Sequence, residues 1–327
     1  MKIFKIVAIL LVVLSLFLEL LIFSGDSKEQ SNKPLVSVST FSLYDITKHI
    51  AGESVQIINI LPFGVDPHSF ELTPKIMANI EKSSLVFYSG AGLEPWIEKI
   101  SFSVEPINMS KYVHLRKLAE GEHHSHGHDD EDEHQDEDEH EHEHHDEDCS
   151  HSELDPHYWL DFENMQKMVY VVSDELIKIL PQNKSMYEKN RDTYIKMLID
   201  LDTKYKSQLH SCEMRSVILN HNFLGYVADK YDFHVNSLNG LSPEAEPSAS
   251  DIKRILQEIK ESGVHTLFYE SFINAKVIES ISRDTHVKIE VLQPLGNITA
   301  DEAKANATYN SLMLQNLEKL KKAMICH

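Results

Sequence analysis

The sequence has no basic patch and no basic helix face, so it does not predict a protein that binds nucleic acid. Its 327 residues carry 31 Lys and Arg against 52 Asp and Glu, a formal net charge of −21. Sixteen of these acidic residues lie in the segment 120–151, which contains no Lys or Arg. The body of the chain is therefore only mildly acidic, and a chain of this length predicts two domains.

Cysteine is missing from the N-terminal region, which excludes the usual lipid anchor of bacterial lipoproteins. Lys2 and Lys5 precede a long apolar run at residues 6–23, and a polar stretch follows. This layout is typical of an export signal. The run is also nearly long enough to span a bilayer. Residues 1–33 are therefore expected to be a signal peptide or a membrane anchor plus linker, with the rest of the chain in the periplasm or on the extracellular face.

The chain has only three cysteines, which allow one disulfide in an exported protein. Cys149 lies in the acidic segment and is interpreted as a metal ligand or free thiol. Cys212 comes just before an expected strand, at its amino end, and Cys326 ends the last expected helix. Because that helix runs back antiparallel to the strands, we predict that Cys212 and Cys326 meet at one edge and form a disulfide.

The acidic segment 120–151 is rich in histidine, with ten histidines among its 32 residues. Imidazoles and carboxylates at this density attract divalent cations, zinc and copper in particular. We therefore predict auxiliary, weak metal sites in the segment 120–151. The histidines concerned are His123, His124, His126, His128, His134, His140, His142, His144, His145 and His151.

Short apolar runs alternate with helical patterns in two parts of the chain. Strands are predicted at residues 35–39, 55–60, 85–89, 217–220, 266–269 and 288–292, and helices at 43–51, 74–82, 223–231, 251–262, 275–284 and 301–324. This alternation predicts an α/β fold of two lobes, each a parallel sheet flanked by helices. The lobes are expected at 34–160, where 120–151 is an insertion, and at 211–327.

Between the lobes, residues 161–210 read as connecting helices that Pro181 interrupts once. The second piece, 185–209, is long and strongly charged. A helix of this length spans about 37 Å at 1.5 Å per residue. We therefore expect one long, rigid helix to join the two lobes.

Three histidines follow expected strands or stand in rigid loops, where open α/β sheets bind their ligands. His68 and His157 each come directly after an Asp-Pro dipeptide, and His221 follows the strand at 217–220. The Asp-Pro dipeptides favour an extended, rigid backbone, which lowers the entropy cost of presenting a ligand. Three neutral imidazoles form a common set of zinc ligands. The sequence thus predicts a zinc site that draws on both lobes.

Zinc held by three histidines with an open position also occurs in hydrolytic enzymes. The candidate ligands are spread over two lobes, so no enzymatic activity is expected. A surface adhesin or metal buffer is a third class, in which capture itself is the purpose. Manganese is the alternative cargo, although three imidazoles suit it less well than oxygen-rich sites do.

Five segments carry a resemblance to a known family. They are Asp66-Pro67-His68-Ser69-Phe70, Asp155-Pro156-His157-Tyr158-Trp159-Leu160-Asp161, Asn220-His221-Asn222-Phe223-Leu224-Gly225-Tyr226, Leu241-Ser242-Pro243-Glu244-Ala245-Glu246-Pro247-Ser248 and Val291-Leu292-Gln293-Pro294-Leu295-Gly296. With these segments the chain resembles the zinc-specific solute-binding proteins of ABC transporters, the metal-binding cluster of that superfamily.

This resemblance implies two lobes joined by a rigid helix, with one Zn(II) ion clamped between them and delivered to a cognate ABC permease in the membrane. It carries over His68, His157 and His221 as the ligands. In the family, histidine at the third of these positions goes with zinc, whereas manganese-binding members tend to have glutamate there. A monomer is expected.

The chain departs from the family at the fourth ligand. Many members supply a carboxylate near the Pro-Leu-Gly turn, but here Gln293 and Gly296 occupy that stretch. Water, Glu270 from the neighbouring strand end, Gln293 or a histidine of the segment 120–151 remain as candidates for the fourth position, and we favour water.

Overall fold

The structure, a computed structural model, describes residues 33–65, 70–100, 102–118, 154–239, 248–270 and 276–327. Residues 1–32 of the predicted signal or anchor segment, His68 and the ten histidines of the segment 120–151 lie outside these residues. Within them, no helix is both long enough and apolar enough to cross a membrane. Residues 35–327 form one compact unit.

The first sheet is built from four parallel strands in the order β2-β1-β3-β4. They are β1 (Leu35–Val38), β2 (Gln56–Asn59), β3 (Leu85–Tyr88) and β4 (Ile107–Asn108), with the helices α2 (Phe41–Ala51) and α3 (Pro74–Glu81) between them. The predicted start of α3 is confirmed, because the hydroxyl of Thr73 accepts a hydrogen bond from the backbone N–H of Ile76 and Pro74 occupies the first turn.

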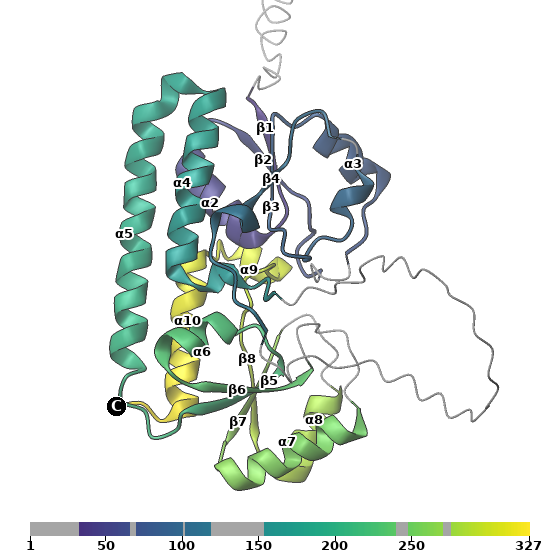
Figure 1. The fold of residues 1–327 in the computed structure, drawn as a ribbon, viewed down its shortest axis with the longest axis vertical. Coiled ribbons are helices and arrows are strands. Elements are labelled where there is room, and N and C mark those ends of the chain that lie inside the picture. The colour runs from purple at the N-terminus through teal and green to yellow at the C-terminus, as the bar shows by residue number, and fades with distance from the viewer. Residues whose placement is uncertain (1–32, 66–69, 101, 119–153, 240–247, 271–275) are drawn as a thin grey trace, which may run out of the picture. The chain divides into compact units, whose positions relative to one another are not determined.

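The second sheet has four parallel strands in the equivalent order, β6-β5-β7-β8. The strands are β5 (Ser216–His221), β6 (His234–Asn239), β7 (Thr266–Tyr269) and β8 (Lys288–Val291). The helices are α6 (Gly225–Tyr231), α7 (Ala249–Ser262), α8 (Lys276–Thr285), α9 (Ala300–Lys304) and α10 (Tyr309–Met324). Figure 1 shows the two sheets, and the predicted α/β class is confirmed.

Two helices connect the sheets: α4 (Phe162–Ile179) and the 25-residue α5 (Lys184–Gln208), separated by a 3-10 turn at Pro181–Asn183. Helix α5 packs against α2 and α4 along its upper part in Figure 1 and against α10 lower down. The hydroxyl of Tyr194 donates to Asp45 Oδ2 at 2.6 Å, and that of Tyr205 donates to the carbonyl of Met313 at 2.7 Å. The long connecting helix therefore holds helices that belong to both sheets.

The hydrophobic core is shared between the two halves. Its largest cluster includes Val38 of β1, Leu198 of α5 and Leu219 of β5, all fully buried. Two smaller clusters lie under the outer helices. One includes Ile255 of α7 and Leu267 of β7, and the other includes Ile80 of α3 and Val86 of β3. Because one cluster draws on both sheets, burial of apolar surface stabilises them together.

The sequence reading differed from the structure in three elements. It missed the short strand β4 and the strand β6, whose sequence His-Val-Asn-Ser-Leu-Asn is too polar to stand out as apolar. The helix predicted at 301–324 is two helices, α9 and α10. Asn306 takes a left-handed backbone (φ 54°), and the hydroxyl of Thr308 caps the new helix at the N–H of Ser311.

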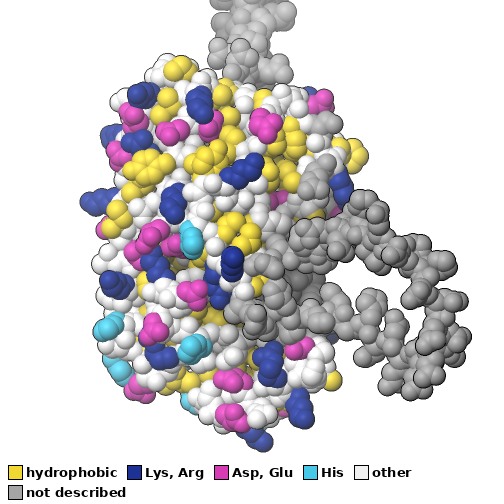
Figure 2. All heavy atoms as spheres, viewed as in Figure 1, with side chains coloured by type: hydrophobic (Ala, Val, Ile, Leu, Met, Phe, Trp, Pro, Cys, Tyr) yellow, Lys and Arg dark blue, Asp and Glu magenta, His cyan; other side chains and the backbone are white. Residues whose placement is uncertain are grey.

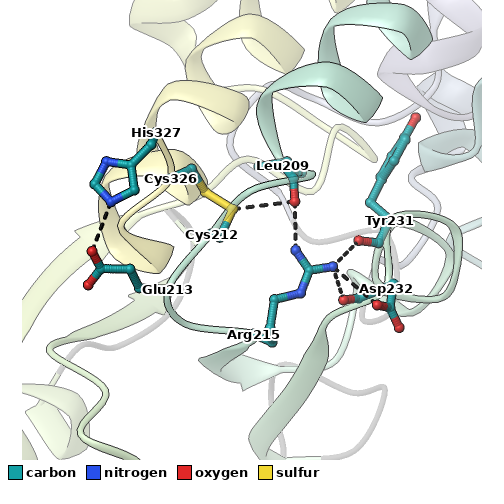
Figure 3. Close-up of a disulfide and its surroundings, with 8 residues drawn as sticks. All are labelled: Leu209, Cys212, Glu213, Arg215, Tyr231, Asp232, Cys326 and His327. Atoms are coloured by element: carbon teal, nitrogen blue, oxygen red, sulfur yellow. Dashed lines mark hydrogen bonds and ion pairs between the residues drawn. A yellow bond between two sulfur atoms is a disulfide. The ribbon is translucent and has the colours of Figure 1, made fainter.

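Cys212 and Cys326 form a disulfide, with their Cα atoms 3.9 Å apart (Figure 3). The two cysteines also pair as an antiparallel bridge next to β5. Around them, the guanidinium of Arg215 donates to the carbonyls of Leu209 at 2.6 Å and of Tyr231 at 2.7 Å. The C-terminal end of α10 is thereby attached to the segment that leads into β5.

Charges on the described surface are mixed. On the face that Figure 2 shows, Lys and Arg side chains are interspersed with Asp and Glu side chains over the coloured part of the molecule. Several large apolar side chains are exposed, for example Tyr112, Tyr170 and Ile199. Exposed apolar residues are ordinary for a protein surface.

Candidate metal centre

The strand order places two chain connections at the carboxyl end of the second sheet, where ligands of open α/β sheets bind. His221 is the last residue of β5, and Glu270 follows the last residue of β7. The two strands are neighbours, with Leu219 opposite Phe268 in the register. Both His221 and Glu270 therefore lie two residues beyond this pair, side by side at the sheet edge.

His221 and Glu270 are buried and in contact. A carboxylate oxygen of Glu270 contacts Nδ1 of the His221 ring. The backbone N–H of Glu270 donates to Asn220 Oδ1 at 3.2 Å, which fixes the start of the loop after β7. In this arrangement Glu270 orients the imidazole through Nδ1, and Nε2 is the ring nitrogen that is left for a metal ion.

His157 is oriented in the same way by Asp155. It stands directly before the 3-10 turn Tyr158–Leu160. Asp155 Oδ1 accepts a hydrogen bond from the backbone N–H of His157 at 2.9 Å and lies 2.9 Å from its Nδ1. The carboxylate is completely buried. An aspartate two residues before a histidine can close this turn and hold the ring at once.

The two imidazoles face each other through Nε2. His157 Nε2 and His221 Nε2 are 3.5 Å apart, although 64 residues separate them in the chain. Two nitrogen ligands of one tetrahedral zinc ion, each about 2.0–2.1 Å from it, lie about 3.4 Å from each other. Trp159 and Phe223 surround the pair, with ring centroids 5.2–6.4 Å from those of the histidines. The geometry suits a zinc ion between the two rings.

Within the described part of the chain, no group of three or more His, Cys, Asp or Glu side chains could hold a metal ion. The third predicted ligand, His68, lies outside that part. The segment that leads to it is anchored, because Asn297 Nδ2 donates to the carbonyls of Pro62 and Val65 at 2.6 and 2.7 Å. Asn297 itself is fully buried.

The Pro-Leu-Gly turn, where the sequence lacks a carboxylate, makes contacts between the two sheets. The carbonyl of Pro294 accepts from the indole N–H of Trp159 at 2.8 Å, and that of Gly296 accepts from the N–H of Phe41 at 2.9 Å. Gln293 Nε2 donates to Glu302 Oε1 at 2.6 Å. The amide of Gln293 is thus engaged with the start of α9.

The first sheet has a buried carboxylate of its own. Glu94 accepts hydrogen bonds from the hydroxyl of Ser39 and from the backbone N–H groups of Ser89 and Gly90, just beyond β1 and β3. Burial raises the pKa of Glu94 from 4.5 to about 7, because loss of hydration outweighs these hydrogen bonds.

The Glu94→Gln variant is expected to show a different dependence of stability on pH. A carboxyl group whose pKa is higher in the folded state contributes stability that is present below pH 4.5 and lost as the pH rises through 7. Relative to wild type, the variant should gain about 3 kcal/mol in free energy of unfolding between pH 4.5 and 7.5. Urea titrations across this range measure the difference. Parallel curves, as expected for the exposed Glu105→Gln control, would contradict the assignment.

A protein-family model matches the chain from the first strand to the last helix. The model for the periplasmic component A of the zinc-uptake complex, ZnuA, matches residues 36–323. The chain belongs to the ZnuA family.

The relatives of this ZnuA-family chain are also named as zinc-uptake or zinc-binding proteins. The high-affinity zinc uptake system protein ZnuA of Bacillus subtilis is 32% identical over 306 residues, which cover 92% of this chain and 91% of that protein. The zinc-binding lipoprotein AdcA of Streptococcus pneumoniae is 27% identical over 301 residues, but the match spans only 58% of AdcA. The crystal structure of the Zn(II)-bound ZnuA-like domain of AdcA superposes with a TM-score of 0.70 at 25% identity, over 90% of this chain and 99% of that domain.

Membership of the ZnuA family confirms the resemblance that the motifs carried. It supports zinc uptake rather than manganese transport, hydrolysis or adhesion as the function, with Zn(II) as the transported ligand. The family is one of transport proteins that bind their solute outside the cytoplasm.

Sequence reasoning missed how the ZnuA-family histidines are oriented. It treated the Asp-Pro dipeptide before His157 only as a rigid entry, whereas Asp155 also holds the ring. The spacing of two residues was the available signal. It considered Glu270 as a fourth ligand, and the structure pairs one of its carboxylate oxygens with Nδ1 of His221.

Proposed function

We propose that this protein binds one Zn(II) ion tightly through His157 and His221, with His68 as the third ligand, and delivers it to a cognate ABC permease. The observation that carries the proposal is the pair of facing Nε2 atoms, 3.5 Å apart, whose rings are each held from behind by a buried carboxylate. A carboxylate on Nδ1 selects the tautomer that presents Nε2 and makes it a better donor.

Water completes the coordination in this proposal, and Glu270 acts on His221 from the outer shell. An open fourth position keeps the ion exchangeable, which suits a protein that must release its cargo. Gln293 is a weaker candidate, because its amide donates to Glu302. The histidines of the segment 120–151 are proposed as weaker, auxiliary sites that raise the local zinc concentration.

Further parts of the proposal concern the whole chain. Residues 1–33 direct export as a signal peptide or membrane anchor, and the protein acts as a monomer without enzymatic activity or nucleic-acid binding. Residues 34–160 and 211–327 are proposed as the two lobes, joined by the helices of 161–210. The shared core around α5 supports a stiff connection between them.

Metal titration of two chains tests the proposal: the exported chain, and the same chain without residues 120–151. We expect one tight zinc site in both, preferred over manganese because imidazole donors suit zinc better. The longer chain alone should bind further zinc ions weakly. Competition with a chromogenic chelator gives the affinity, and metal analysis after dialysis gives the stoichiometry.

The deletion separates the two kinds of site. Loss of tight binding in the shorter chain would mean that a histidine of 120–151 is a direct ligand and that water is not. Preference for manganese in both chains would contradict the proposed cargo.

A further inference from the structure

One arginine connects the two halves of the candidate metal centre. Arg116 Nε forms an ion pair with Asp229 Oδ2 at 2.7 Å, and Arg116 Nη1 lies 3.7 Å from Asp155 Oδ2. Asp155 is the residue that orients His157. Asp229 belongs to α6, the helix that follows β5 and its last residue, His221. A single guanidinium thus contacts both Asp155, which orients His157, and α6, which follows His221.

The backbone of Arg116 is held at the same place. Its N–H donates to the hydroxyl of Tyr226 at 2.8 Å, and that hydroxyl donates to the carbonyl of Asp155 at 2.9 Å. The N–H of Asp155 in turn donates to the carbonyl of Arg116 at 2.9 Å. Tyr226 lies on α6, next to Gly225. These bonds set where the Arg116 side chain begins, so little freedom is lost when its guanidinium takes its place.

Gly225, the first residue of α6, makes room for this contact. A Cβ atom there would come within 2.8 Å of both Arg116 Nη1 and Asp155 Oδ2. Real Cβ atoms do not approach other atoms so closely, so any larger residue would displace the guanidinium or the carboxylate. Because glycine has no side chain, Arg116 and Asp155 can approach each other closely over the start of α6.

The environment distinguishes Arg116 from an ordinary surface arginine. Its partner Asp229 is 62% exposed, and an exposed pair of this kind contributes little by itself. Asp155 is completely buried, however, and a buried carboxylate requires compensating partners. Arg116, Gly225 and Asp229 also line a cavity of about 410 Å³ beside the site.

We propose that Arg116 is a positioning residue for zinc binding: it holds Asp155 against His157 and ties this pair to the helix that follows His221, which sets the separation of the two Nε2 atoms. This inference rests on the proposed zinc site. Arg116 acts on the metal only through Asp155 and His157, and it touches neither the ion nor its ligands' Nε2 atoms.

The test compares Arg116→Met with Arg191→Met in the full exported chain. Both arginine side chains are nearly equally exposed, 17% and 18%, and each pairs with a largely exposed aspartate. Partners of metal-ligating histidines typically contribute 10- to 100-fold to affinity. We expect Arg116→Met to raise the zinc dissociation constant about tenfold, at the lower end of that range because it acts one step further out. Arg191→Met should leave the constant unchanged.

A second readout separates positioning from general stability. With cobalt(II) as the probe, the visible absorption of Arg116→Met should shift, because the angle between the two imidazoles changes. Arg116→Lys keeps the charge without the planar fork and should restore less than half of the lost affinity. Unchanged zinc affinity, or weaker binding with a wild-type cobalt spectrum, would overturn the inference.

His221→Ala, measured alongside, distinguishes a failure of the proposed zinc site from a failure of the proposed role of Arg116. If His221→Ala binds zinc as tightly as wild type, the proposed site itself is wrong. If His221→Ala loses tight binding while Arg116→Met keeps wild-type affinity and spectrum, the site stands and only the role of Arg116 is rejected.

Discussion

His221→Ala is expected to weaken zinc binding at the tight site by at least about 100-fold, because even outer partners of a zinc ligand contribute 10- to 100-fold. The variant removes a buried imidazole whose Nε2 faces that of His157 at 3.5 Å, and it leaves Glu270 without the ring that it contacts. The loss should exceed that of any single histidine substitution within 120–151. Competition titration with a chelator measures it. Affinity should also fall with acid, since each imidazole must be neutral to bind the ion.

The matched control is His210→Ala, which removes an exposed histidine of the same half of the chain. It should leave tight zinc binding unchanged. Circular dichroism of both variants establishes that they are folded. Wild-type zinc affinity in His221→Ala would reject the site proposed here.

Replacing both Cys212 and Cys326 with serine is expected to lower the free energy of unfolding by about 2–5 kcal/mol. The disulfide joins residues 114 positions apart, so its main effect is to restrict the unfolded chain. It attaches the end of α10 to the segment before β5, and His221 lies at the opposite end of that strand. Urea unfolding of the metal-free protein under non-reducing conditions measures the change.

Cys149→Ser serves as the control for that pair, because Cys149 lies in the segment 120–151 and is expected to contribute nothing to this bridge. The double variant should keep its tight zinc site when folded. A change in unfolding free energy below about 0.5 kcal/mol would mean that the bridge does little for the fold, and alkylation of both thiols in unreduced protein would mean that it does not form.

Local sequence patterns predicted most of the elements well. The strand β7 begins and ends where the apolar run predicted, and α3 begins at the Thr73 cap. Pro181 interrupts the helical stretch where a missing N–H requires it. The errors arose where the local signal is weak, as in the polar strand β6, or where a left-handed residue such as Asn306 divides a continuous helical pattern.

The amino-acid sequence alone determined the α/β class, the long connecting helix, the family and the histidines proposed as ligands, because alternation, caps and short motifs are local properties of the chain. Only the tertiary structure decided that Nε2 of His157 faces Nε2 of His221, that Glu270 contacts the ring of His221, and that Arg116 joins Asp155 to α6. These contacts link residues 39 to 113 positions apart. They depend on the register between β5 and β7 and on the packing of both sheets against shared helices, which no local pattern encodes.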